Sequence, residues 1–286
     1  MSTTTYVNST ATIAAWNLAT YKNPDSDHDT LTPERIERQA EGLRLLDAEL
    51  VMLVEIRSED HLKKLVEHLG NDGIEYEYDF IPQVNPGPSH GLMHIGVIFK
   101  EGVEVSNSSL MQGSDLNKQG YRKAYVAECK IGKFDFTVIG VHLKSGREKA
   151  NQNFRDEQCK VIGEFITDLR GPDDRNPDVL LMGDFNMIPG RDASNFHYLG
   201  GDDVMDFISS WDLQERFSHI LESGRENLLD GFAISRKRST EYIRGSLRLF
   251  PMHWAMKIGQ AKFRNDVSDH LPFAASFQIH SDQGRD

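Results

Sequence analysis

Residues 179–186 read VLLMGDFN. The first four, Val179 to Met182, are apolar, and a short continuous apolar run is typical of a strand that is buried on both faces. Asp184 and Asn186 follow at once, and buried polar groups cost desolvation free energy unless they pair or bind an ion. Because strand ends are where a sheet can bring distant residues together, this stretch predicts part of a functional site.

Other apolar runs along the chain end in the same way. The polar residues concerned are Asn17 after Ile13–Trp16, Glu55 after Leu50–Val54, His142 after Phe136–Val141, Asp230 after Leu228–Leu229, and Asp269 with His270 before the final strand. Each has an ordinary explanation, since an Asn after a strand is usually a turn residue and a Glu there is usually a solvated charge. Their occurrence together in one chain favours the functional interpretation.

Five segments resemble the motifs of the endonuclease/exonuclease/phosphatase superfamily, the DNase I-like proteins. They are Trp16-Asn17, Val54-Glu55, Gly140-Val141-His142-Leu143-Lys144-Ser145, Gly183-Asp184-Phe185-Asn186 and Ser268-Asp269-His270, in that family's order. The resemblance spans residues 17 to 270. It implies an α/β fold, a four-layer αββα sandwich of two packed mixed sheets with outer helices, and a site at one end of the paired sheets.

The resemblance implies a metal site built from oxygen ligands. Glu55 would be the main ligand, and Asn17 and Asp269 would assist it. Oxygen ligands of this kind suit Mg²⁺, with Mn²⁺ as the alternative, and do not suit zinc.

The catalytic residues that the resemblance implies are His142, Asp184, Asn186, Asp230 and His270. Asp184 would orient or deprotonate the attacking water, and Asn186 would hold a phosphate oxygen. His270, oriented by Asp230, would stabilise the negative charge that develops on the phosphoryl oxygens, or act as acid or base near neutral pH. His142 would contact the phosphate from the other side.

Two positions depart from the family's pattern. Gly231 follows Asp230 where relatives often carry an aromatic residue or a histidine, and Val54 precedes Glu55 where glutamine is usual. Both departures leave the expected ligands intact, but they blur the assignment to a subfamily.

The charge of the chain is uneven. The net charge is −12, whereas residues 236–265 contain eight Lys or Arg and one acid, Glu241. This segment interleaves cations with aromatic residues, as surfaces that bind single-stranded nucleic acid do, although a solvated loop with apolar residues packed on the core explains it almost as well. The expected substrate-binding residues are Arg236, Lys237 and Arg238, together with Arg122 and Lys144 near the predicted site.

Bulk composition is that of a globular protein. Of 286 residues, 38% are hydrophobic and 27% charged, and no apolar run is long enough to span a bilayer. Residues 1–10 lack the basic and apolar regions of a signal peptide, so we expect a cytoplasmic location. Cys129 and Cys159 are expected to be buried thiols. We find no evident signal for a protein partner.

Patterning predicts one domain over residues 6–280, with flexible termini at 1–5 and 281–286. The expected strands are Thr12–Leu18, Leu50–Val54, Ile74–Ile81, Leu92–Phe99, Tyr121–Ile131, Phe134–Leu143, Val179–Met182, Phe232–Ser235 and Ala274–Ile279. Helices are expected from Pro33 after the cap Thr32, after the cap Ser58, over Asn151–Arg170 and over Asp203–Phe217, and a loop over Gln83–Gly91.

The family resemblance implies a divalent-metal-dependent phosphoesterase. Together with the basic segment, it makes a nuclease acting on DNA or RNA the first hypothesis. The alternative keeps the chemistry and changes the substrate to a small phosphate ester, an inositol phosphate or a phospholipid headgroup. A third hypothesis, a non-catalytic binding module on the same fold, is disfavoured by the intact Glu55, Asp184, Asp230 and His270.

Overall fold

The structure, a computed structural model, describes residues 9–20, 31–83, 93–169, 178–200, 205–207, 217–223, 226–235 and 239–280. Several expectations lie outside these ranges. They are the flexible termini, most of the loop Gln83–Gly91, and the basic residues Arg236, Lys237 and Arg238. These remain predictions.

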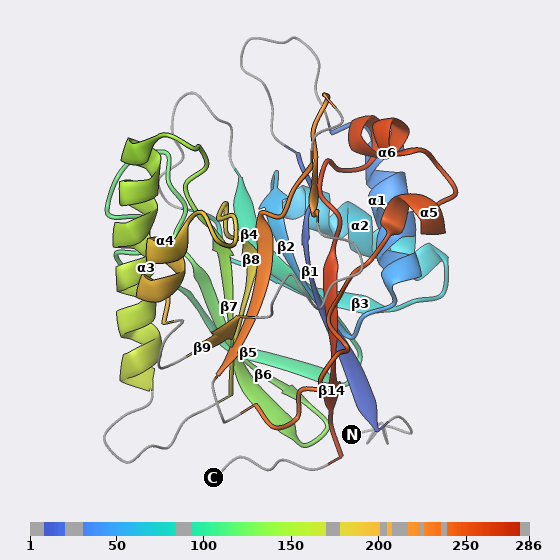
Figure 1. Cartoon of the computed structure of the whole chain (residues 1–286). Coiled ribbons are helices and arrows are strands. Elements are labelled where there is room, and N and C mark those ends of the chain that lie inside the picture. The colour runs from blue at the N-terminus through green and yellow to red at the C-terminus, as the bar shows by residue number, and fades with distance from the viewer. Residues whose placement is uncertain are drawn as a thin grey trace.

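Two six-stranded sheets form the framework (Figure 1). The first has the strand order β13 (Arg248–Leu249), β14 (Phe273–Gln278), β1 (Thr10–Asn17), β2 (Leu50–Ile56), β4 (His94–Lys100) and β3 (Tyr76–Phe80). The second has the order β5 (Val103–Leu110), β6 (Tyr125–Ile131), β7 (Phe134–His142), β8 (Asp178–Asp184), β12 (Asp230–Ser235) and β9 (Met205–Phe207). Each sheet contains one parallel pair, β1–β2 or β7–β8, among antiparallel neighbours, so both sheets are mixed.

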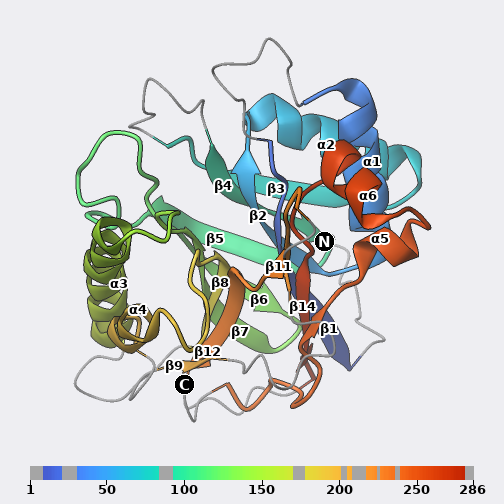
Figure 2. The same cartoon turned by 45° about the horizontal axis from the view of Figure 1, so that its top comes forward.

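Helices cover the outer faces of both sheets (Figure 1; Figure 2). Beside the first sheet lie α1 (Pro33–Leu46), α2 (Glu59–Asn71), α5 (Met252–Ala255) and α6 (Gln260–Asp266). Beside the second lie α3 (Lys149–Leu169) and α4 (Ala193–Tyr198). A separate two-stranded ribbon pairs β10 (His219–Ile220) with β11 (Glu226–Asn227). The predicted four-layer αββα sandwich is therefore confirmed.

The main core lies where the inner faces of the two sheets meet. Met52 and Val97 of the first sheet and Val138 and Leu180 of the second are fully buried in one cluster. Burial of such a side chain stabilises the fold by about 1.5–3 kcal/mol. A second cluster joins the outer face of the second sheet to α3, where Cys159 is buried as predicted. These layers hold the strand ends in fixed positions.

The two helix caps expected from the sequence are present in the structure. The Thr32 hydroxyl accepts a hydrogen bond from the Arg35 amide at 3.2 Å at the start of α1, and the Ser58 hydroxyl accepts one from the His61 amide at 3.3 Å at the start of α2. Each satisfies an amide that the helix leaves without an internal partner.

The predicted helix over Asp203–Phe217 is wrong where it can be compared. Residues Met205–Phe207 form β9, which pairs with the edge of β12, and residues 208–216 lie outside the described ranges. Phe207 packs edge-on against Phe185 and Phe196. The free edge of β12 and this aromatic contact override the local helical pattern.

The basic segment is more structured than a solvated loop. Its described part contains β13, α5 and α6, and within it Phe263 is fully buried whereas Trp254 is 65% exposed. No helix in the described ranges is both long and apolar enough to cross a membrane.

Candidate active site

The polar strand ends meet at one end of the paired sheets, the upper end in Figure 1. Strand register brings His142 of β7 opposite Asp184 of β8, and Asp184 opposite Asp230 of β12. The amide of Asn17, at the end of β1, donates to Asp184 Oδ2 at 3.1 Å and to Glu55 Oε1 at 3.3 Å. Asn17 therefore joins the two sheets at the point where the acidic residues gather.

Glu55 owes its position to an irregularity in β2. The pairing of β2 with β4 shifts register between Val54 and Ile56, so Glu55 is the extra residue of a β-bulge, with a left-handed φ of 58°. Its carbonyl accepts a hydrogen bond from the Thr20 hydroxyl. A left-handed conformation costs a non-glycine residue about 1 kcal/mol or more, and such strain persists where the surroundings enforce it. The bulge turns the carboxylate toward the end of the sheets.

The environment of Glu55 disfavours its negative charge. Burial raises the pKa of this carboxyl group, and the nearby Asp269 carboxylate raises it further, whereas His270 and Arg122 lower it. His142 Nε2 lies 3.7 Å from Glu55 Oε1 and 3.6 Å from Asp184 Oδ2. Burial, assisted by the charges of Arg122 and His270, lowers the pKa of His142 well below its usual value, so this imidazole is neutral at pH 7.

The sequence Gly183-Asp184-Phe185-Asn186 forms a tight turn at the end of β8. Gly183 has φ 130°, and a Cβ there would lie 2.2 Å from the Val141 carbonyl oxygen. The Asn186 amide donates to Asp184 Oδ1 at 2.9 Å, and its side-chain amide donates to the Leu143 carbonyl at 3.2 Å. Burial and the Asp230 carboxylate raise the pKa of Asp184 to about 7, although the charge of His270 opposes this.

Asp230 and His270 form a buried pair. His270 Nδ1 lies 2.6 Å from Asp230 Oδ2, which leaves Nε2 facing the site. Burial by itself would lower the pKa of His270, but the charge and hydrogen bond of Asp230 outweigh it and raise the pKa well above its usual value. His270 is therefore an imidazolium at neutral pH in this arrangement.

Hydrogen bonds from the Ser268 and Trp16 side chains hold the Ser268-Asp269-His270 segment against β1. The Ser268 hydroxyl donates to the Asn17 carbonyl at 2.6 Å and accepts from the His270 amide at 2.9 Å. The indole of Trp16 donates to the His270 carbonyl at 2.8 Å. The bonds from Ser268 to Asn17 and from Trp16 to His270 link residues about 250 positions apart, so they hold the segment before β14 at the end of β1.

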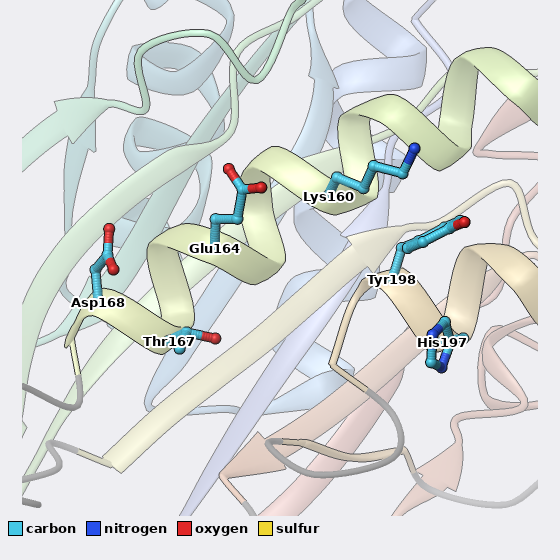
Figure 3. Close-up of a pocket in the computed structure, with 6 residues that line it drawn as sticks. All are labelled: Lys160, Glu164, Thr167, Asp168, His197 and Tyr198. Carbon is cyan, nitrogen blue, oxygen red and sulfur yellow. The ribbon is translucent and has the colours of Figure 1, made fainter.

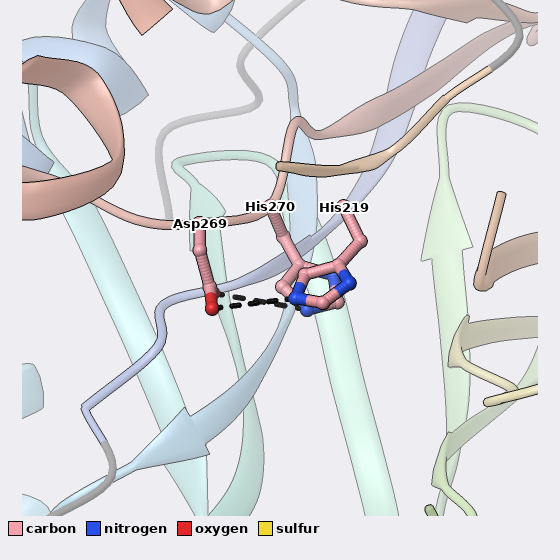
Figure 4. A group of neighbouring side chains, drawn as sticks. All are labelled: His219, Asp269 and His270. Carbon is pink, nitrogen blue, oxygen red and sulfur yellow. Dashed lines mark ion pairs between the residues drawn. The ribbon is translucent and has the colours of Figure 1, made fainter. Parts of the chain in front are cut away.

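The site contains a histidine that the sequence analysis missed. His219 of β10 lies with its ring 4.7 Å from that of His270, and its Nε2 is 3.5 Å from Asp269 Oδ2 (Figure 4). Asp269 Oδ1 in turn lies 3.8 Å from His270 Nε2. No long apolar run precedes His219, so the strand-end pattern could not identify it.

Among the predicted substrate-binding residues, Arg122 adjoins the site. Its Nε lies 3.5 Å from the His142 carbonyl. Burial lowers the pKa of this guanidinium, and the nearby carboxylates of Glu55 and Asp184 oppose that shift. Lys144 follows β7 and places its ammonium 5.8 Å from the centre of the Tyr121 ring. From the basic segment, Arg264 donates to the carbonyl of Ile220 at 3.2 Å, so α6 adjoins β10.

Several solved structures have the same architecture over nearly the whole chain. An endonuclease/exonuclease/phosphatase family protein from Bacteroides thetaiotaomicron is 16% identical with a TM-score of 0.67, and the match covers 97% of this chain and 98% of that one. D. rerio TDP2, complexed with single-strand DNA product, is 17% identical with a TM-score of 0.66, covering 95% and 100%. A mannosyl-6-phosphatase of B. thetaiotaomicron is 16% identical with a TM-score of 0.63, covering 93% and 98%.

The chain has the DNase I-like fold of endonuclease/exonuclease/phosphatase proteins. The predicted resemblance is confirmed at the level of the fold. No protein-family model and no curated sequence matches the chain.

Within this DNase I-like fold, the unusual Gly231 has a packing reason. A Cβ at this position would lie 2.4 Å from ring carbons of Phe185. The Phe185 ring therefore occupies the space that a side chain after Asp230 would fill, and glycine is required by its neighbour.

The site has the groups to hold a cation. Ligand atoms of Asp184, Asp230 and His270 lie within 4.8 Å of one another, and so do those of His219, Asp269 and His270. The raised pKa values of Glu55 and Asp184 reflect buried negative charge that a bound cation would offset.

A surface hollow of the same molecule lies apart from this site. It is formed between α3 and α4, has a volume of about 440 Å³, and is lined by Lys160, Glu164, Thr167, Asp168, His197 and Tyr198 (Figure 3). None of these residues belongs to the site described above.

Proposed function

We propose that the chain is a divalent-metal-dependent phosphoesterase that hydrolyses phosphodiester bonds, with nucleic acid as its substrate. The observation that carries this proposal is the convergence of the Asp230–His270 pair with Asn17, Glu55 and Asp184 at one end of the paired sheets. The DNase I-like fold supports a hydrolase of this class.

Glu55, with Asn17 and Asp269, would hold Mg²⁺, and Mn²⁺ is the alternative ion. The carboxylate oxygens of Glu55 and Asp269 are ligands that these cations prefer. The oxygen of Asn17 accepts from the Ala19 amide at 2.9 Å, so the side-chain amide must turn to join them. The bound ion supplies charge neutralisation for the phosphate and stabilisation of the leaving oxygen. The raised pKa of Glu55 supports this role, because a desolvated carboxyl group beside another carboxylate favours a nearby cation.

The remaining polar groups would handle the water and the phosphate. Asp184, whose pKa of about 7 suits exchange of a proton near neutrality, orients or deprotonates the attacking water. His270 donates from Nε2 to the phosphoryl oxygens while Asp230 fixes its ring. Asn186 keeps one amide proton for a phosphate oxygen, since the Leu143 carbonyl accepts the other. His142, the last residue of β7, would contact the phosphate from the other side.

Two observations bear on the substrate. Arg122 adjoins the site, and the matched structure of D. rerio TDP2 holds a single-strand DNA product, which together support nucleic acid. The match to a mannosyl-6-phosphatase favours a second candidate, a small phosphate ester such as a sugar phosphate, an inositol phosphate or a phospholipid headgroup.

A substrate panel tests the proposal. Purified protein is incubated with plasmid, single-stranded DNA, RNA, bis-p-nitrophenyl phosphate and inositol phosphates in Mg²⁺, Mn²⁺ or EDTA, with His270→Ala as the blank. We expect metal-dependent cleavage of nucleic acid that EDTA and His270→Ala both abolish. Hydrolysis of small esters alone would move the protein to the second candidate, and no hydrolysis of any substrate would refute both.

Charge reversal separates the two substrates further. Arg236→Glu, Lys237→Glu and Arg238→Glu together should weaken cleavage of a polyanion, because contacts to successive phosphates add. Hydrolysis of bis-p-nitrophenyl phosphate by the same variant serves as the control and should change little.

A further inference from the structure

Three potential ligand atoms converge beside the proposed Mg²⁺ ligands. His219 Nε2 lies 3.5 Å from one oxygen of Asp269, and His270 Nε2 lies 3.8 Å from the other. All three side chains have a ligand atom within 4.8 Å of the other two. Figure 4 shows both imidazoles directed at the same carboxylate. Two imidazole nitrogens and a carboxylate therefore surround one point.

The backbone fixes these three residues relative to one another. His219 and His270 form an antiparallel bridge. The Ile220 amide donates to the Asp269 carbonyl, and the Leu271 amide donates to the Ser218 carbonyl, each at 2.7 Å. The cluster is thus set by main-chain bonds on both sides, which is what a preformed ligand site requires.

The second nitrogen of each ring is also informative. His270 Nδ1 is bound to Asp230 at 2.6 Å, and metal-ligating histidines usually donate their other ring N–H to a carboxylate in this way. His219 Nδ1 is buried and has no hydrogen-bond partner among the described residues. In both rings Nε2 is the nitrogen that lies near the Asp269 carboxylate.

The distances and donor types indicate the class of ion. Ligand atoms around a tetrahedral ion with bonds of about 2.0–2.1 Å lie roughly 3.4 Å apart, so small rotations of these side chains suffice. Imidazole nitrogen suits Zn²⁺, Co²⁺ and similar ions, whereas Mg²⁺ prefers oxygen.

We propose that His219, Asp269 and His270 form a second site for a transition-metal ion such as Zn²⁺, which adjoins the oxygen site of Glu55 and shares Asp269 with it. The site shares Asp269 and His270 with the proposed hydrolytic machinery, but it does not depend on hydrolysis. An ion bound there takes the place of the proton on His270 Nε2, which is released when the ion binds. Zn²⁺ therefore inhibits Mg²⁺-dependent hydrolysis, and removal of His219 weakens that inhibition.

Cobalt provides a direct readout of the site. Untagged protein is titrated with Co²⁺ in saturating Mg²⁺, which fills the oxygen site, and the visible d–d absorption of nitrogen-ligated Co²⁺ is recorded. Zn²⁺ binding is measured in parallel by calorimetry. We expect one Co²⁺ per chain, and a loss of affinity of at least about tenfold in His219→Ala and His219→Gln. His280→Ala, which changes an exposed histidine, is the matched control and should bind as the wild type does.

The variants distinguish failure of this site from failure of the proposed function. Glu55→Ala should retain the Co²⁺ band while Mg²⁺-dependent hydrolysis is lost. An unchanged band in folded His219→Gln would overturn the proposal, and so would a band that Glu55→Ala removes, because the ion would then sit in the oxygen site. Intact Co²⁺ binding without hydrolysis of any phosphate ester would reject the function and leave this site standing.

Discussion

Glu55 illustrates how a single residue can be held in a costly state by its surroundings. It combines a left-handed backbone conformation with a buried carboxyl group whose pKa is raised by burial and by Asp269. Neither condition helps the folded protein by itself. A cation ligand, however, gains from a fixed and desolvated carboxylate, because the cation replaces the water that the carboxylate has lost.

The substitution Glu55→Gln separates function from stability. We expect Mg²⁺-dependent turnover to fall about 10³-fold, as loss of several kcal/mol of electrostatic stabilisation implies. The melting temperature measured in EDTA should not fall, because the neutral amide removes a disfavoured charge. Glu67→Gln, on the exposed face of α2, is the control for both measurements. A large drop in melting temperature would show that Glu55 is structural.

His61 is a buried histidine that takes part in a structural hydrogen-bond network. Its Nε2 donates to Gln39 Oε1 at 3.0 Å, and the Gln39 amide donates to the carbonyls of Leu18 and Val267. Burial, with the charges of Arg57 and Arg35, lowers the pKa of His61 to about 3. This neutral network connects α1 and α2 to the segment that leads to His270.

The depressed pKa of His61 predicts how stability depends on pH. His61 binds a proton near pH 6.5 in the unfolded chain and only near pH 3 in the folded chain. The stability that neutral His61 contributes is therefore complete above pH 6.5 and is lost progressively as the pH falls. The free energy of unfolding should fall by up to about 1.4 kcal/mol per pH unit across this window. Urea unfolding at pH 7, 6 and 5 measures the slope, and His61→Gln should flatten it. His94, whose pKa is lowered to about 4 by burial, contributes in the same direction and remains in the variant.

Among the elements, α3 does more than cover the second sheet. Its fully buried Arg155 donates to the carbonyls of Lys144 and Gly146, each at 2.8 Å, and pairs with Asp192 at 3.2 Å. The helix therefore holds the turn that follows His142. Although α3 lies on the outer face of the second sheet, it thereby positions the loop after β7 beside the site.

Replacement of Arg155 by Met should destabilise the protein by about 3 kcal/mol, since it leaves the Lys144 and Gly146 carbonyls without their donor and removes one of the partners of Asp192, which keeps Arg191. Chemical denaturation checks this. Lys160→Met on the same helix removes an exposed pair with Glu157 and the contact of the ammonium with the Tyr198 ring, and should cost about 1 kcal/mol. Equal effects of the two variants would contradict the positioning role of Arg155.

For the whole molecule, the site is also a junction between the two sheets. The Asn17–Asp184 bond crosses from β1 to β8, and of the proposed Mg²⁺ ligands Asn17 and Glu55 lie in β1 and β2, whereas Asp269 lies on the segment before β14. A cation that binds the folded chain and not the unfolded one stabilises the entire fold by mass action.

Mg²⁺ at one hundred times its dissociation constant should therefore add about 2.7 kcal/mol to the free energy of unfolding. For a chain of this size, that corresponds to a rise in melting temperature of roughly 5 °C. Scanning calorimetry in Mg²⁺ and in NaCl of equal ionic strength measures the difference. The rise should disappear in Glu55→Gln; if it persists there, the stabilising ion binds elsewhere.

Local patterns were enough for nine of the strands and for the polar residues at their ends, but not for β5, β9, β10, β11 or β13. Leu50–Val54 is a continuous apolar run and forms a strand with every residue of the run buried, and the caps Thr32 and Ser58 begin helices as expected. These features depend on neighbours within a few positions, through side-chain period and capping geometry. The amino-acid sequence alone therefore determines these elements and most of the candidates for the site.

Other features arise only when distant segments meet. The strand β9 exists because β12 offers an edge, and β5 is polar, with four of its eight residues exposed, because it forms the edge of its sheet. His219 enters the site only through its bridge to His270, 51 positions away, and Glu55 is aimed by a bulge against β4. Propensity and periodicity carry no information about such pairings, since sheet register and packing between layers are set by contacts across the chain. The tertiary structure thus determines how the candidate residues face one another, and this arrangement is what their chemistry requires.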